Sequence, residues 1–176
     1  MNIVRLLLTV FYLFGMSFLV QAESDYVLGP GDQIQIKVYG HEDLTTSSML
    51  GSDGKITFQF VGELQAAGVT VAMIAEKIRS GLADDYIINP LVSINIVRYR
   101  NFYIQGEVEK PGGYPFEPGI NVSKALALAG GLTDRGSEKK IELITQHKNN
   151  QKLTRKVTLN NEVKAGDIIV VGQRFF

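Results

Sequence analysis

The chain has 176 residues, a length that favours one or two small domains. Its 45% hydrophobic and 20% charged residues are ordinary for a globular protein, so a packed core is expected. Lysine plus arginine and aspartate plus glutamate number 18 each, which argues against a basic surface, and no nucleic-acid partner is expected. Because the sequence contains no cysteine, disulfides, thiolate metal sites and cysteine-linked lipid anchors are excluded within it.

The amino terminus has the pattern of a secretory signal peptide. Arg5 precedes an uncharged apolar run from Leu6 to Val20, and Ala22 provides a small residue for cleavage. The alternative is a membrane anchor, but the run is shorter than the roughly 20 residues that span a bilayer as a helix. We therefore expect residues 1–22 to be a signal peptide and the mature protein to be exported.

The folded part opens on the stretch from Tyr26 to Gly40, which predicts a sharp turn followed by a strand. Pro30 restricts its own φ, and the glycines beside it tolerate backbone angles that other residues avoid. Asp32 can accept hydrogen bonds from nearby backbone amides, as Asx side chains do in turns. Polar and apolar residues then alternate, which is typical of a strand with one buried face; the apolar members are Ile34, Ile36 and Val38.

The rest of the first half reads as strands around one helix. The polar stretch 41–48 is expected to be a loop, and Asp53-Gly54 is a hairpin signal. A short strand is expected before Gly62, and a second short strand or a loop is expected around Leu64. Thr70 is the predicted N-cap of an amphipathic helix over residues 71–82, and residues 91–97 alternate as a further strand.

The second half repeats the mixture of strands and one helix. A strand is expected over residues 102–108, followed by a type II turn at Pro111-Gly112. Asn121 is the predicted N-cap of a helix that ends at Gly130-Gly131. Further strands are expected over residues 141–145, 153–159 and 168–171, the last after a second Gly-Asp turn at Gly166-Asp167. This pattern predicts a β-grasp-like α+β unit.

No constellation of residues indicates catalysis. His41 and His147 are expected in polar loops, and we interpret both as exposed side chains. The adjacent carboxylates at 42–43 and 84–85 are interpreted as solvated charge in loops, and neighbours in a strand would point to opposite faces. We therefore predict no catalytic, metal-binding or cofactor-binding residue, no cofactor, and a protein that is not an enzyme. No ligand-binding residue is assigned.

Basic and aromatic residues interleave between Val97 and Tyr103. This stretch could hold a sugar chain, because aromatic faces and guanidinium groups suit carbohydrate. The other interpretation is an edge strand with solvated arginines and a half-buried aromatic row. We favour the edge strand.

Several of these motifs, in their order, resemble one known family. The segments Tyr26–Asp32, Ser52–Ile56, Gly68–Thr70 and Asn89–Ser93 are similar to the polysaccharide export domain of outer-membrane polysaccharide export proteins. The segments Gly106–Gly112, Ala129–Leu132 and Gly166–Val171 are similar to the soluble-ligand-binding β-grasp domain that follows it in that family. The resemblance implies a polysaccharide export domain over residues 23–100 and a β-grasp-like domain over residues 101–176.

The resemblance also implies a function and a location. Such proteins form periplasmic rings of identical subunits that guide polysaccharide, without covalent chemistry, from inner-membrane machinery to the cell surface. The expected partners are therefore the polysaccharide chain, further copies of the same chain, and an inner-membrane polysaccharide copolymerase. On this interpretation a set of motif residues shapes turns and does not bind ligand: Gly29, Pro30, Gly31, Asp32, Asp53, Gly54, Pro111, Gly112, Gly130 and Gly131.

Two departures from the family shape the hypothesis. The leader has no cysteine to acylate, and only Gly172–Phe176 follow the last predicted strand, too few to cross a membrane. We therefore expect a short form, periplasmic and associated with the outer membrane, that docks on a separate outer-membrane protein. The alternative is a periplasmic saccharide-binding module that regulates an envelope complex.

Overall fold

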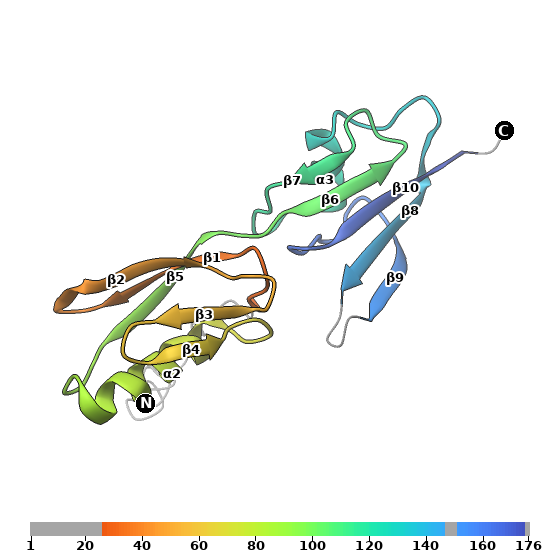
Figure 1. Cartoon of the computed structure of the whole chain (residues 1–176). Helices are drawn as coiled ribbons and strands as arrows, with labels where there is room; N and C mark the ends of the chain where they lie inside the picture. The colour runs from red at the N-terminus through yellow and green to blue at the C-terminus, as the bar shows by residue number, and fades with distance from the viewer. Residues whose placement is uncertain (1–25, 147–150, 175–176) are drawn as a thin grey trace, which may run out of the picture.

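The computed structural model describes residues 26–146 and 151–174. The expected signal peptide and His147 lie outside the described residues. The described chain forms two lobes, and β5 of the first leads into β6 of the second through residues 99–101 (Figure 1). Strands and two helices make up the described part, so the predicted α+β class is confirmed.

The first lobe combines two small sheets and a helix. β1, β2 and β5 form one antiparallel sheet in the order β2-β1-β5, and β3 and β4 form a separate hairpin. Helix α2 contacts β5. The bounds are β1 Gln33–Val38, β2 His41–Met49, β3 Lys55–Phe58, β4 Gly62–Gln65, α2 Val71–Asp85 and β5 Val92–Arg98.

Sequence periodicity explains the core of this lobe. The predicted alternation in β1 holds, because its three apolar residues are all at most 2% exposed. The Thr70 hydroxyl accepts a hydrogen bond from the Met73 amide, which confirms the predicted cap of α2. One face of α2 is fully buried against the sheets; its members are Ile74, Ile78 and Leu82.

The second lobe is a five-stranded sheet with one helix. Its order is β7-β6-β10-β8-β9, in which β10 runs parallel to β6 and antiparallel to β8. The Asn121 side chain caps α3 as predicted, and Gly130 and Gly131 follow its last turn with positive φ. The bounds are β6 Phe102–Gly106, β7 Gly112–Tyr114, α3 Val122–Leu128, β8 Gly136–Gln146, β9 Lys152–Val157 and β10 Ile168–Gln173.

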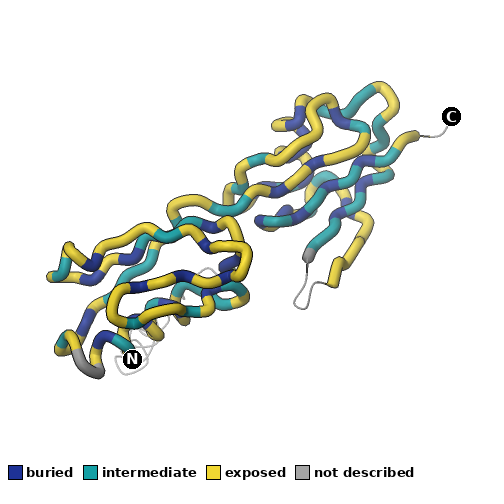
Figure 2. Tube along the Cα trace, viewed as in Figure 1, coloured by how far each residue is buried: buried dark blue, intermediate teal, exposed yellow. Residues whose placement is uncertain are grey.

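Each lobe has its own hydrophobic core (Figure 2). Phe58 is the largest buried side chain of the first core, and Phe102 that of the second. The two clusters share no buried residue. The lobes are therefore separate packing units, and the contacts that join them lie outside the two cores.

Some local predictions were wrong. The stretch expected to be a loop after His41 is the nine-residue strand β2, because its backbone pairs with β1 despite its polar side chains. Asp53-Gly54 forms a tight turn, yet it joins β2 to β3, which lie in different sheets. The β3–β4 hairpin turns instead at Phe60, whose φ is 67°.

Two further corrections concern Gly112 and the acidic pair. Gly112 lacks the positive φ that a type II turn needs, and it begins β7 by pairing with Ile104. Asp84 and Asp85 belong to the last turn of α2 and not to a loop. In each case tertiary pairing or helix extension overrode a local signal.

Candidate functional site at the domain junction

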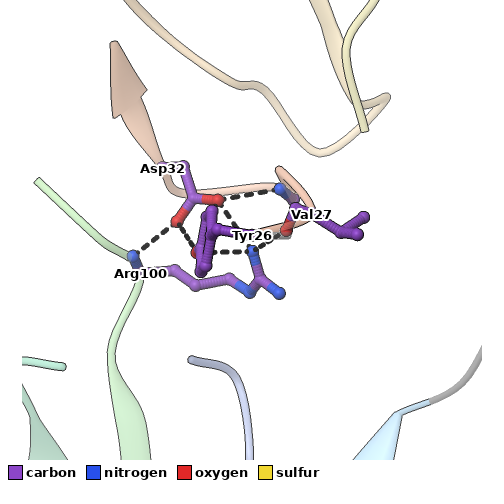
Figure 3. A network of polar contacts seen from close by, with 5 residues as sticks. Tyr26, Val27, Asp32 and Arg100 are labelled. Atoms are coloured by element: carbon purple, nitrogen blue, oxygen red, sulfur yellow. Dashed lines mark hydrogen bonds and ion pairs between the residues drawn. The ribbon is translucent and has the colours of Figure 1, made fainter. Parts of the chain in front are cut away.

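The Gly-Pro-Gly-Asp turn lies where the two lobes meet (Figure 3), and its aspartate has no solvent exposure. Asp32 Oδ2 accepts a hydrogen bond from the Gly29 amide at 2.8 Å, as the sequence predicted. The Asp32 amide in turn donates to the Gly29 carbonyl at 3.1 Å. These two bonds close the turn and aim the carboxylate inward, away from solvent.

The buried carboxylate is paired with Arg100, which lies in the connection between β5 and β6. Arg100 Nη1 lies 2.7 Å from Asp32 Oδ2, and the Arg100 amide donates to Asp32 Oδ1 at 2.7 Å. Nη1 also donates to the Tyr26 hydroxyl at 3.0 Å and to the Val27 carbonyl at 3.4 Å. A buried charge needs such a partner and such hydrogen bonds to be tolerated.

Tyr26 completes this network. Its hydroxyl lies 2.8 Å from both oxygens of Asp32, to which it donates. Burial raises the pKa of Tyr26 well above its ordinary value, the nearby Arg100 opposes this rise, and the Asp32 carboxylate adds to it. The hydroxyl therefore keeps its proton and remains a hydrogen-bond donor at physiological pH.

Aromatic rings connect this network to the second lobe. The rings of Tyr26 and Tyr99 meet edge to face with centroids 4.8 Å apart. Phe116 follows β7 of the second lobe and contacts Tyr99 at 5.4 Å and Tyr26 at 6.5 Å. Pairs of this geometry contribute about 0.5–1.5 kcal/mol beyond the area that they bury. The three rings thus form a cluster shared by both lobes.

The interpretation of the basic and aromatic stretch was wrong for one arginine. β5 is an edge strand and Arg98 is exposed, as expected. Arg100, by contrast, is bonded to a buried aspartate, and Phe102 is fully buried in the second core. The stretch is therefore the covalent and electrostatic connection between the lobes.

The second Gly-Asp turn faces the same connection. Asp167 is 1% exposed and accepts a hydrogen bond from the Lys164 amide at 2.9 Å. Burial raises its pKa, while the Lys164 amide and the Thr145 hydroxyl oppose the rise by hydrogen bonding to it. The Gly166 amide donates to the Asn101 carbonyl at 3.1 Å, so this turn also contacts the connection between the lobes.

Among the described residues, the other turn residues singled out in the sequence make no hydrogen bond to Tyr26, Asp32 or Arg100. Asp53 and Gly54 form the turn before β3, Pro111 and Gly112 lead into β7, and Gly130-Gly131 ends α3. His41 begins β2 and is partly exposed. The junction therefore brings together the turn that contains Asp32 and the turn that contains Asp167.

A second feature is a cluster of exposed apolar residues that we call the apolar pole: Tyr39, Phe60, Tyr86, Ile88 and Leu91. All are more than half exposed, and Ile88 is 93% exposed. The Phe60 and Tyr86 rings stack at 4.6 Å, and the Tyr39 amide donates to the Leu91 carbonyl. The turns that carry them gather at the end of the first lobe farthest from the second (Figure 1).

Other candidate sites are weaker. A groove of about 270 Å³ beside α3 lies just below the roughly 300–1,000 Å³ of ordinary small-molecule pockets; its lining includes Glu117, Ile120, Lys124 and Leu128. Among the described side chains, no group of three or more His, Asp or Glu is placed to hold a metal ion. None of the helices in the two described ranges is long and apolar enough to span a membrane.

Comparison with known proteins agrees with this two-lobed organisation. Residues 20–97 match the family described as polysaccharide biosynthesis/export protein, and residues 101–156 match the SLBB domain. The chain therefore contains a polysaccharide export domain followed by an SLBB domain. The resemblance seen in the sequence is confirmed.

Individual relatives carry related names. The chain is 32% identical over 125 residues to the exopolysaccharide production protein ExoF of Rhizobium meliloti, covering 62% of this chain and 29% of ExoF. It is 26% identical over 162 residues to the polysialic acid transport protein KpsD of Escherichia coli, covering 85% of this chain and 28% of KpsD. It is 27% identical over 152 residues to the EPS I polysaccharide export outer membrane protein EpsA of Ralstonia nicotianae, covering 71% of this chain and 40% of EpsA. The match thus spans well under half of each of these relatives.

Sequence reasoning found the Asp32 turn but missed its partner. A buried aspartate at the start of an apolar strand needs a cation or several donors. Arg100, next to Tyr99 in the connection, was the residue in the sequence that could have predicted this cation. The distance of 68 residues between Asp32 and Arg100 hid the pairing from any local pattern.

Proposed function

We propose that the protein is a non-enzymatic periplasmic component of a capsule or exopolysaccharide export apparatus. Residues 23–100 serve as the export domain and residues 101–176 as the β-grasp-like domain in this proposal. The protein forms, or contributes to, an oligomeric conduit that guides polysaccharide across the periplasm and the outer membrane. Its partners are the polysaccharide chain, other copies, an inner-membrane copolymerase and an outer-membrane protein.

The observation that carries this proposal is the order of the two matched domains. The export family and the SLBB domain follow each other along most of the described chain, and the named relatives are production, transport or export proteins for polysaccharides. One of them is named an outer membrane protein, which supports an envelope location. No single turn or pocket among the described residues supports the proposed function as strongly.

The experiment that tests the proposal measures surface polysaccharide in a strain that lacks this gene, with and without complementation. Loss of surface polymer that the intact gene restores is the expected result. Unchanged polymer, under conditions where the wild type makes it, would contradict a role in export. It would favour the alternative of a regulatory saccharide-binding module, which titration with short oligosaccharides would then examine.

The apolar pole supports the assembly part of the proposal. Exposed apolar clusters of this kind mark contact surfaces, and aromatic residues often dominate the binding energy of such surfaces. Phe60 has a left-handed φ of 67°, and its exposed ring stacks on that of Tyr86. We propose that the pole contacts a second copy of the chain in the conduit.

Light scattering on the protein from Glu23 onward tests this contact. Phe60→Asn is the informative variant, because asparagine tolerates the left-handed backbone at this position while it removes the ring. We expect oligomers for the wild type and a lower mass for Phe60→Asn. Leu153→Asn is the control, since Leu153 is 58% exposed and lies in the second lobe. A wild type that stays monomeric at high concentration would contradict the contact.

A further inference from the structure

We propose that Arg100 is a positioning residue that fixes the two domains relative to each other, and that two glycine-containing turns, one from each domain, hold its side chain. The inference concerns the geometry of the chain and goes beyond the proposed role in export. It rests on the packing around the guanidinium and on the bonds that hold it.

The first turn packs directly on the guanidinium. A Cβ placed on Gly29 would lie 2.6 Å from Arg100 Nη1 and 2.8 Å from Cζ, closer than real Cβ atoms come to non-bonded heavy atoms. A Cβ on Gly31 would lie 3.3 Å from the Cβ of Arg100. The first turn therefore has glycine at these positions partly because the Arg100 side chain fills the space beside them.

The second domain contributes the opposite wall. A Cβ on Gly166 would lie 3.0 Å from Arg100 Nε and 3.6 Å from its Cδ. Gly166 precedes β10, the strand that pairs with β6 and β8 in the second domain. The Arg100 side chain thus lies between the Gly-Asp turn of the first domain and the Gly-Asp turn of the second.

The guanidinium cannot move aside cheaply. Its Nη1 is bonded to a carboxylate with no solvent exposure and to the Tyr26 hydroxyl, so any displacement leaves a buried charge without its partner. The residues on either side of Arg100 are also held: Tyr99 by the aromatic cluster, and the Asn101 carbonyl by the Gly166 amide. Motion between domains is the usual expectation for a chain connected by one short segment. Here the segment itself is bonded to both domains.

The distance between the two domains tests the proposal directly. The sequence has no cysteine, so one cysteine can be introduced in each domain and spin-labelled without background. Lys77 in α2 and Lys124 in α3 are exposed sites for Lys77→Cys and Lys124→Cys. We expect pulsed electron–electron double resonance on this labelled protein to give a single narrow distribution of distances between the two spin labels.

The test variant is Arg100→Lys, which keeps the charge but ends one bond short of the position of Nη1, the atom that bonds Asp32, Tyr26 and Val27. We expect its distance distribution to broaden or shift while circular dichroism shows a folded protein. Arg98→Lys is the matched control, because Arg98 is an exposed arginine two residues away. An unchanged distribution for Arg100→Lys would overturn the proposal, and so would an equal change for Arg98→Lys.

A second pair of variants keeps the proposal testable if Arg100→Lys does not fold. Gly29→Ala places a methyl group in the space of the guanidinium and leaves every charge in place. Neither Gly29 nor Gly112 has a positive φ, and a Cβ on Gly112 would meet nothing within 4 Å, so Gly112→Ala is the control. We expect a lower urea midpoint and a broader interdomain distance for Gly29→Ala alone. Equal behaviour of the two alanine variants would overturn the assigned packing.

Discussion

The two Gly-Asp turns of this protein have the same backbone design and different electrostatic surroundings. In both, the aspartate amide donates to the carbonyl three residues earlier at 3.1 Å, and the carboxylate accepts the amide of that same residue. Both aspartates are buried and both are followed by an apolar strand. Asp32, however, is paired with Arg100, whereas Asp167 has neutral donors and a pKa raised by burial.

The difference shows that one sequence motif can carry two physical roles. At Asp167 the motif closes a turn before β10, and its charge is an electrostatic cost that hydrogen bonds reduce. At Asp32 the same turn supplies a buried anion that holds the connection between two domains. Asp32 is hydrogen-bonded to a cation across the junction, whereas the side chains of Lys164 and Arg155 act on Asp167 through their charges alone.

Asp32→Asn is the substitution with the largest expected effect on this comparison. It keeps the shape of the side chain but removes the charge that Arg100 pairs with. Removal of one partner from a buried ion pair costs about 3–5 kcal/mol. We therefore expect the free energy of unfolding to fall by about that amount in urea titrations. A change below roughly 1 kcal/mol would show that the pair contributes no more than an exposed one.

Tyr26→Phe is expected to have an intermediate effect. The substitution deletes the hydroxyl that donates to Asp32 and accepts from Arg100, but it leaves the ring in the aromatic cluster. Hydrogen bonds to charged groups contribute about 1.5–3 kcal/mol, so a loss in this range is expected in the same titrations. Tyr114→Phe in the second domain is a control, since its hydroxyl bonds a backbone carbonyl at the surface.

Asp167→Asn should have the smallest effect on the free energy of unfolding at neutral pH. It should also change how that free energy depends on pH. The asparagine oxygen can still accept from the Lys164 amide, so the free energy of unfolding should stay within about 1 kcal/mol of the wild type. Because the pKa of Asp167 is raised on folding, the native state binds its proton more tightly than the unfolded state. This group therefore disfavours folding progressively as pH rises from below 3.8 through its folded pKa.

Urea titrations over a series of pH values measure this effect. The stability of Asp167→Asn relative to the wild type should increase from acidic to neutral pH, since only the wild type acquires a buried charge. A relative stability that is independent of pH, or that decreases as pH rises, would contradict the raised pKa.

Local signals in the sequence determined most of the elements. The alternation in β1, the cap at Thr70 and the Asn121 cap with its Gly130-Gly131 stop all correspond to observed elements, because each depends on residues a few positions apart. The order of motifs also identified the family. These features are properties of the chain over one or two turns of backbone.

Tertiary structure decided what local patterns could not. Strand β2 forms because its backbone pairs with β1 although its side chains are polar. Phe60 takes a left-handed φ because the β3–β4 hairpin turns there. Above all, the partnership of Asp32 with Arg100 depends on bringing together residues 68 positions apart. Burial strengthens the attraction between the two charges and makes the loss of either partner costly, and this burial exists only when the two domains and their connection have folded together.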